Sequence, residues 1–152
     1  MFVTSRTANA LRTRVDPSPP EVIVVEKDDV SRSLMANVIA RQNYAVQTTG
    51  SAADVMEYLL HGGLPVIVIG EELEEGINRA KAIELLKCCN PKSTIILVSD
   101  EISPTEEIQL LKHGIFYRTL RPASATDWVE LQWAVDCACN TLKPACAPDL
   151  LH

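Results

Sequence analysis

The chain alternates between short apolar runs and longer segments in which apolar residues recur every three or four positions. A short continuous apolar run is typical of a strand that is buried on both faces of a parallel sheet. Val22–Val25 and Val66–Ile69 are such runs, and Tyr44–Thr48 is rich in strand-forming residues. The pattern predicts five strands, at about residues 22–25, 44–48, 66–69, 94–98 and 115–120.

The segments after the strands have the apolar spacing of amphipathic helices. Residues that favour helix ends mark their limits. Asp28 or Asp29 and then Ser51 can cap two helices at their N-termini, Pro104 suits the first turn of another, and Gly62 follows the end of the second. We expect helices that run to about residues 42, 61, 89, 114 and 142.

Five strand–helix units in succession indicate a parallel sheet with helices on both faces. Because such crossovers are right-handed, the predicted fold is a three-layer α/β/α doubly wound sandwich with a five-stranded parallel sheet. The domain should span residues 21–142. Residues 1–20, which contain arginine and several prolines, read as a disordered arm, and residues 143–152 as a tail.

The charge of the chain is unevenly distributed. The net charge is −6, and residues 1–15 carry Arg6, Arg12 and Arg14 without an acid, which leaves −9 for the rest (−6 minus +3). An acidic body argues against sequence-independent binding to nucleic acid. No apolar run approaches the roughly 20 residues of a membrane helix, so we expect no membrane partner. An odd number of cysteines without a secretory signal suggests reduced thiols, and therefore a cytoplasmic protein.

In an open parallel sheet, ligands bind outside the carboxyl ends of the strands. Four segments of this sequence follow the predicted strands at that edge. They are residues 26–29, 70–72, 99–100 and 120–122. We therefore expect any site of the domain to be built from these segments.

Taken in order, these segments resemble the receiver domains of response regulators, which have a flavodoxin-like fold. The resemblance covers residues 21–142. It rests on Val24-Val25-Glu26-Lys27-Asp28, Asn43-Tyr44-Ala45-Val46, Gly50-Ser51-Ala52, Leu97-Val98-Ser99, Gly114-Ile115-Phe116 and Leu120-Arg121-Pro122. It implies a stand-alone domain in bacterial two-component or phosphorelay signalling, and not an enzyme.

In that family, acidic residues after the first strand and an aspartate after the third hold Mg²⁺, and the aspartate accepts a phosphoryl group. Carried over residue by residue, Glu26 and Lys27 stand at the acidic pair and Gly70 at the phosphoacceptor position. Ser99 matches the hydroxyl position, while Arg121 stands at the lysine position, followed by Pro122. The resemblance therefore implies a degenerate pocket, or pseudo-receiver.

The charges of this pocket argue against a metal. Glu26, Lys27 and Arg121 sum to +1, and Mg²⁺ is held by carboxylate oxygens whose charge offsets the loss of its water. We therefore expect no cofactor and no bound magnesium. We further expect the Lys27 ammonium to lie near the position that the metal takes in the family.

Two alternatives remain open. Glu71 is one residue from Gly70 and could give residual binding of magnesium or a phosphoryl group, although Glu71, Glu72, Glu74 and Glu75 more simply predict a solvated acidic loop. The chain could also be a redox or metal sensor that uses its five cysteines. Cys137 and Cys139 are two apart on a predicted helix and do not face each other, and Cys88, Cys89 and Cys146 complete the set.

The resemblance also implies a protein-binding surface, built from the fourth helix, the fifth strand and the fifth helix. We call it the interaction face, and its candidate residues are Phe116, Tyr117, Arg118, Trp128 and Trp133. Aromatic residues and arginine are enriched in interface cores. The expected partners are a sensor kinase, another regulator, an output protein or a second copy of the chain. Because Arg118 replaces the usual aromatic switch residue of the family, we expect a face held in one state.

Overall fold

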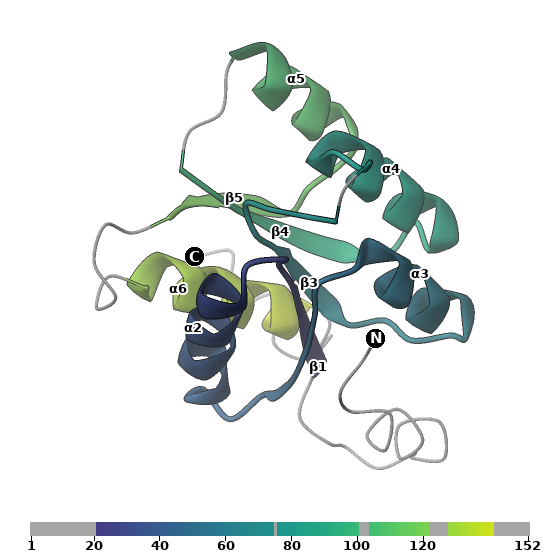
Figure 1. Ribbon diagram of the computed structural model, residues 1–152. Coiled ribbons are helices and arrows are strands. Elements are labelled where there is room, and N and C mark those ends of the chain that lie inside the picture. The colour runs from purple at the N-terminus through teal and green to yellow at the C-terminus, as the bar shows by residue number, and fades with distance from the viewer. Residues whose placement is uncertain (1–20, 75, 101–103, 122–127, 142–152) are drawn as a thin grey trace.

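The computed structural model describes residues 21–74, 76–100, 104–121 and 128–141. The arm at residues 1–20, the tail at residues 143–152 and Pro122 lie outside these ranges. Ten elements alternate along the chain (Figure 1). They are β1 (Glu21–Val25), α2 (Asp29–Ala40), β2 (Ala45–Thr49), α3 (Ala52–Leu60), β3 (Val66–Ile69), α4 (Arg79–Cys89), β4 (Thr94–Ser99), α5 (Pro104–Lys112), β5 (Tyr117–Leu120) and α6 (Val129–Thr141).

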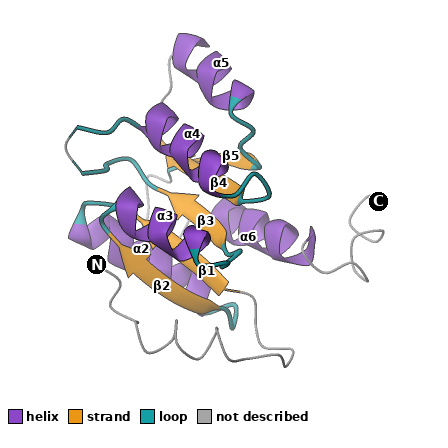
Figure 2. Cartoon of the chain, turned by 90° about the vertical axis from the view of Figure 1, so that its right-hand side faces the viewer, coloured by secondary structure: helices purple, strands orange, loops and turns teal. Residues whose placement is uncertain are grey.

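The five strands form one parallel sheet in the order β2-β1-β3-β4-β5. Helices α2 and α6 cover one face, and α3, α4 and α5 cover the other (Figures 1 and 2). This is the predicted three-layer α/β/α sandwich, and it confirms the fold class. Since the chain passes from β1 to β2 on one side and to β3 on the other, the topological switch point lies between β1 and β3.

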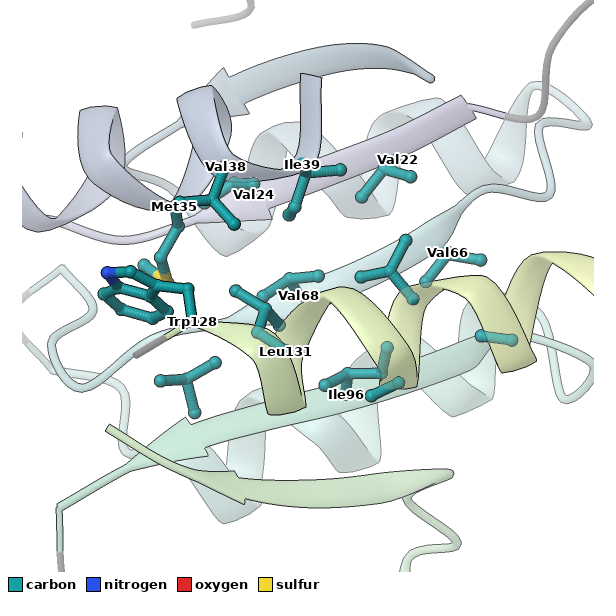
Figure 3. Close-up of a cluster of buried hydrophobic side chains, with 14 of the residues drawn as sticks. Val22, Val24, Met35, Val38, Ile39, Val66, Val68, Ile96, Trp128 and Leu131 are labelled. Carbon is teal, nitrogen blue, oxygen red and sulfur yellow. The ribbon is translucent and has the colours of Figure 1, made fainter. Parts of the chain in front are cut away.

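Successive residues of each central strand point to opposite layers, as the pleat requires. Val22 and Val24 pack with the buried side chains of α2 and α6 (Figure 3), whereas Ile23 and Val25 pack with those of α3 and α4. Both faces of β1 are therefore buried. This explains why the strands appear in the sequence as continuous apolar runs.

The helix ends follow the capping residues of the sequence. The Asp28 carboxylate accepts a hydrogen bond from the amide of Ser31 at 2.8 Å, and Ser51 and Asn78 cap α3 and α4 in the same way. The fifth strand begins at Tyr117, two residues later than predicted. Within the described ranges, no helix is long and apolar enough to cross a lipid bilayer.

Candidate functional site

The candidate site lies at the switch point, where β1 and β3 end side by side. Val25 pairs with Ile69 at the end of the two strands, and the Gly70 amide donates to the Val25 carbonyl at 2.9 Å. The next residues of the two strands, Glu26 and Gly70, therefore face each other directly. This is the place at which the family resemblance puts the metal and the phosphoacceptor.

The Glu26 carboxylate is buried (1% exposed) and accepts hydrogen bonds from three backbone amides. Oε1 accepts from Glu71 at 2.8 Å, and Oε2 accepts from Asp28 at 3.0 Å and from Glu72 at 3.2 Å. Burial raises the pKa of this carboxyl above its ordinary value, while the three amide hydrogen bonds act in the opposite direction. The side chain thus ties the loop after β1 to the loop after β3.

Gly70 leaves the space that Glu26 fills. A Cβ atom at position 70 would overlap Glu26 Oε1, and it would lie 2.9 Å from Glu26 Cδ and 3.0 Å from Met35 Cε. Gly70 is not among the described glycines with positive φ, so its backbone conformation is open to other residues. A side chain at position 70 would therefore displace the Glu26 carboxylate from its present place.

Of the other pocket residues, Ser99 is buried at the end of β4, and its carbonyl accepts from the Arg121 amide at 2.9 Å. The Arg121 guanidinium reaches across to α2, where Nη2 donates to Ser31 Oγ at 2.6 Å. Arg121 also helps to hold the pKa of Asp28 low, after the dominant hydrogen bonds from Ser31. The structure therefore brings Glu26, Gly70, Ser99 and Arg121 to one edge of the sheet.

No contact among the described residues holds the Lys27 ammonium at the pocket, so its expected position there stays a prediction. The Lys27 side chain is exposed, and within the described part of the chain it makes no side-chain hydrogen bond or ion pair. The cation that lies against the loop after β1 is instead Arg32. Its Nη1 donates to the carbonyls of Glu26 at 2.8 Å and Lys27 at 3.3 Å, and its Nη2 pairs with Asp29.

Sequence reasoning missed Arg32, although its spacing offered a signal. The side chain lies on the first turns of α2, three residues after Asp29, where a long cation can fold back over the preceding loop. The guanidinium also lies near Gly50, where an added Cβ would come within 3.3 Å of Nη1. The Arg32 guanidinium thus binds the loop after β1 and lies beside the loop after β2.

The acidic loop after β3 is not the solvated segment that we expected. Glu72 is exposed, but the Glu71 carboxylate accepts from the Asp100 amide and pairs with Arg79 at 3.7 Å. Glu74 accepts from Ser51 Oγ at 2.6 Å and from the Ala52 amide at 2.9 Å, at the N-terminus of α3. Glu75 lies outside the described residues. Both half-buried carboxylates are therefore engaged with the protein itself.

Four of the five candidate residues of the interaction face reach the surface of the protein. Trp133 is 54% exposed and Phe116 41%, while Tyr117 and Arg118 are half-buried. The prediction was wrong for Trp128, which is 6% exposed and packs with Met35 and Leu131 in the core (Figure 3). It anchors the start of α6 to the sheet and is not available to a partner.

Tyr117 is held in one position by α6. Its hydroxyl donates to Glu130 Oε2 at 2.7 Å, and its ring lies edge-on to Trp133, with centroids 5.6 Å apart. Thr119 Oγ1 donates to the other oxygen of Glu130, also at 2.7 Å. The hydrogen bonds from Thr119 and Tyr117 lower the pKa of Glu130, and the bond to Glu130 raises the pKa of Tyr117.

A shallow groove of about 280 Å³ runs between α5 and β5. The Arg118 guanidinium lies at its side and pairs with Glu107 at 3.2 Å. The groove is lined by Glu107, Leu110, Ile115, Phe116, Tyr117 and Arg118. Of the eight large apolar side chains that are exposed among the described residues, five belong to α5, to α6, or to β5 and the residue before it. These are Ile108, Phe116, Leu120, Val129 and Trp133.

The cysteines are dispersed. Cys88 is exposed at the end of α4 and Cys89 half-buried, while Cys137 is half-buried and Cys139 buried on α6. No disulfide joins these four described cysteines, and Cys146 lies outside the described residues. Within the ranges that the structure covers, no three His, Cys, Asp or Glu side chains are grouped as a metal ion would require.

Comparison with known proteins gives a likeness of fold. No protein-family model and no curated protein matches the chain. Among solved structures, the chain is similar to a response regulator receiver domain protein from Clostridium thermocellum, with a TM-score of 0.69 and 16% identity over 83% of this chain and 98% of that one. It is also similar to a CheY-like receiver domain protein from Methanospirillum hungatei JF-1 (TM-score 0.66, 15% identity, 78% and 95% covered).

A third similar structure is the beryllofluoride-activated receiver domain dimer of NtrC4, with a TM-score of 0.63 and 19% identity over 76% of this chain and 96% of that one. At these identities the comparisons show that the chain has the receiver-domain fold. The chain spans nearly the whole length of each of these three domains.

Proposed function

We propose that this chain is a pseudo-receiver: a response-regulator-like signalling domain that acts by binding a protein partner and not by accepting a phosphoryl group. The observation that carries the proposal is the pairing of Gly70 with Glu26. Position 70 offers no nucleophile, and the buried Glu26 carboxylate already uses the three loop amides. A phosphoryl group at this position would compete with an internal anion that is held in place.

The residues present do not fit magnesium. Two residues stand at the positions of the acidic pair. Both carboxylate oxygens of Glu26 accept hydrogen bonds from backbone amides, and Lys27 adds a positive charge. Mg²⁺ needs near-octahedral oxygen ligands and gives up water reluctantly. Our proposal therefore includes no metal cofactor and no enzymatic step.

Residual phosphoryl acceptance through Glu71 is the alternative, and the contacts of that residue weigh against it. Its carboxylate is engaged by Arg79 and by the Asp100 amide. A nucleophile must also be placed to within a fraction of an ångström of the reacting atom. For Glu71 to act, it would have to leave both partners and turn toward the position that Glu26 occupies.

The interaction face supports a role in protein binding. Phe116 and Trp133 are large, exposed aromatic side chains on either side of β5, which is an edge strand of the sheet. Exposed aromatic and apolar side chains near a groove are typical of interface cores. The partner can be a kinase, another regulator, an output protein or a second copy of the chain. Tyr117, held by Glu130 and Trp133, supports a face that stays in one state.

Chemical shifts recorded with Mg²⁺ and beryllofluoride, a mimic of the acyl phosphate, test the first half of the proposal. We expect the amide signals of Glu26, Gly70, Ser99 and Arg121 to stay unchanged. Saturable shifts at these positions would mean that a carboxylate accepts the group, and the proposal would be wrong.

Partner capture tests the second half. Bait protein carrying Phe116→Ala with Trp133→Ala is compared with the unchanged chain and with a Leu60→Ala control, since Leu60 is exposed on α3 away from the face. We expect the double variant to lose captured partners and the control to retain them. Equal capture by all three baits would exclude the interaction face.

A further inference from the structure

Arg79 lies where three parts of the structure meet. It is the first residue of α4, and its side chain is 11% exposed. Nη1 lies 3.7 Å from Glu71 Oε1 and donates to the Val98 carbonyl at 3.5 Å, while Nη2 lies 3.6 Å from Glu106 Oε2. One guanidinium thus contacts the loop after β3, the end of β4 and the first turn of α5.

The contacts of Arg79 extend back to the pocket. The residue that it pairs with, Glu71, donates its backbone amide to Glu26 Oε1 at 2.8 Å and accepts from the Asp100 amide with its carboxylate. A continuous series of polar contacts therefore runs from Glu26 through Glu71 and Arg79 to Glu106. An arginine keeps its charge at all ordinary pH values and presents several donors in a fixed plane, so it suits a permanent junction of this kind.

Helix α5 needs such a junction because few of its side chains are buried. It lies beside α4 at the top of Figure 1. Among its described side chains, which do not include that of Leu111, Leu110 is the buried one, and Ile108 is 56% exposed. Two ion pairs attach the helix to the rest of the domain. Glu106 pairs with Arg79, and Glu107 pairs with Arg118.

We propose that Arg79 is a positioning residue that sets the place of α5, and so keeps the groove between α5 and β5 in one arrangement without a metal ion or a phosphoryl group. Its guanidinium, which is always charged, links the loop after β3 to α5. Its importance for signalling rests on the proposed function of the interaction face, but the positioning itself is a property of the isolated protein.

Amide hydrogen exchange of the isolated full chain tests the proposal. The variant is Arg79→Gln, which keeps a polar side chain and removes the charge. The matched control is Lys81→Gln on the same helix, because the exposed pair of Lys81 with Glu84 at 3.4 Å does not reach α5. Glu106→Gln and the double variant with Arg79→Gln complete a thermodynamic cycle, and Arg79→Lys tests rescue by charge.

We expect exchange of the α5 amides to accelerate roughly fivefold in Arg79→Gln, as the loss of the partly buried ion pair with Glu106 allows, while β1 and β3 keep their protection. Glu106→Gln should have a similar effect, the double variant should add little, and Lys81→Gln should change nothing. Partial recovery in Arg79→Lys would show that the charge is what matters.

Two results would overturn the proposal. One is equal exchange of α5 in Arg79→Gln and Lys81→Gln. The other is equal acceleration in α5 and in the central strands, which would mean a general loss of stability. Because these measurements need no partner, they are independent of the capture experiment. Faster exchange in α5 together with unchanged capture by the Phe116 and Trp133 variant would support the positioning role and exclude the interaction face.

Discussion

The Glu26 carboxylate occupies the space into which a side chain at residue 70 would project, so Gly70 and Glu26 depend on each other. A Cβ on Gly70 would overlap Oε1 of Glu26, which is buried and would lose hydrogen bonds from backbone amides if it moved away. In a working receiver pocket the side chain after the third strand carries the chemistry. Here a side chain from the end of the neighbouring strand takes that space.

A double-mutant cycle measures this dependence. Gly70→Ala should lower the free energy of unfolding by about 1–3 kcal/mol, the range expected for overpacking a buried site. In a Glu26→Ala background the same change should be close to neutral, because the overlapping carboxylate is gone. Urea denaturation of the four proteins gives the coupling energy, which we expect to be at least about 1 kcal/mol. Additive effects would show that the two side chains do not share this space.

Restoring the acidic residue at position 70 should not restore phosphoryl acceptance. In Gly70→Asp a second carboxylate would meet the buried Glu26, and like charges at close range prevent both from ionising. We expect no gain of mass after incubation with Mg²⁺ and acetyl phosphate, whose phosphoryl group would pass to the carboxylate oxygen with release of acetate. A phosphoryl adduct located at position 70 by peptide mass spectrometry would contradict this expectation.

Substitutions of the two tryptophans should differ strongly in their effect on the free energy of unfolding. Trp128→Ala removes a core side chain and should cost about 3–5 kcal/mol, whereas Trp133→Ala should cost about 1 kcal/mol or less. The chain has two tryptophans in all, so the variants Trp128→Phe and Trp133→Phe each leave one reporter. Acrylamide should quench the fluorescence strongly in Trp128→Phe, where Trp133 remains, and weakly in Trp133→Phe. Equal quenching would contradict the burial of Trp128.

The sequence predicted the fold well because the sheet is buried on both faces. Val66–Ile69 forms β3 with the bounds expected, and the caps Asp28 and Ser51 begin α2 and α3 where the pattern places them. Apolar runs and capping residues act over a few neighbouring positions, so they can be recognised without knowledge of distant contacts. The start of β5 was less well predicted, because Ile115 and Phe116 precede the strand although their composition suits it.

The edge of the sheet at which the candidate residues lie follows from the fold, whereas their contacts could not be predicted. Glu26, Gly70, Ser99 and Arg121 lie at the same edge of the sheet, because topology decides where the strands end. The direction of a long side chain depends on partners that are distant in sequence, which is why Glu71 was predicted to be solvated although its carboxylate pairs with Arg79.

Two signals in the sequence could have improved the prediction. Tryptophans five positions apart on a helix are separated by about 140°, so Trp128 and Trp133 could not both face a partner. A cation in the first turn of a helix opposes the helix dipole. The position of Arg79 therefore indicated that carboxylates elsewhere compensate for its charge, as Glu71 and Glu106 do.

Glu130 should make the interaction face sensitive to acid. Hydrogen bonds from Thr119 and Tyr117 lower the pKa of this carboxyl in the folded state below its ordinary value of 4.5. A lowered folded-state pKa contributes stability that is fully present above the ordinary value and is lost as the pH falls through the folded-state value. Glu130→Gln should therefore be less stable than the unchanged chain at pH 7, by about 1 kcal/mol for an exposed charged acceptor.

The difference between the two proteins should shrink below about pH 4.5 and vanish once Glu130 is protonated in the folded state. Urea denaturation at a series of pH values measures it, and Tyr117→Phe is the matched control, since it removes one donor and keeps the ring against Trp133. That control should show a smaller difference with the same pH dependence. A difference that is constant from pH 7 to pH 3 would mean that the charge of Glu130 does not contribute, and that Tyr117 is held by packing against Trp133.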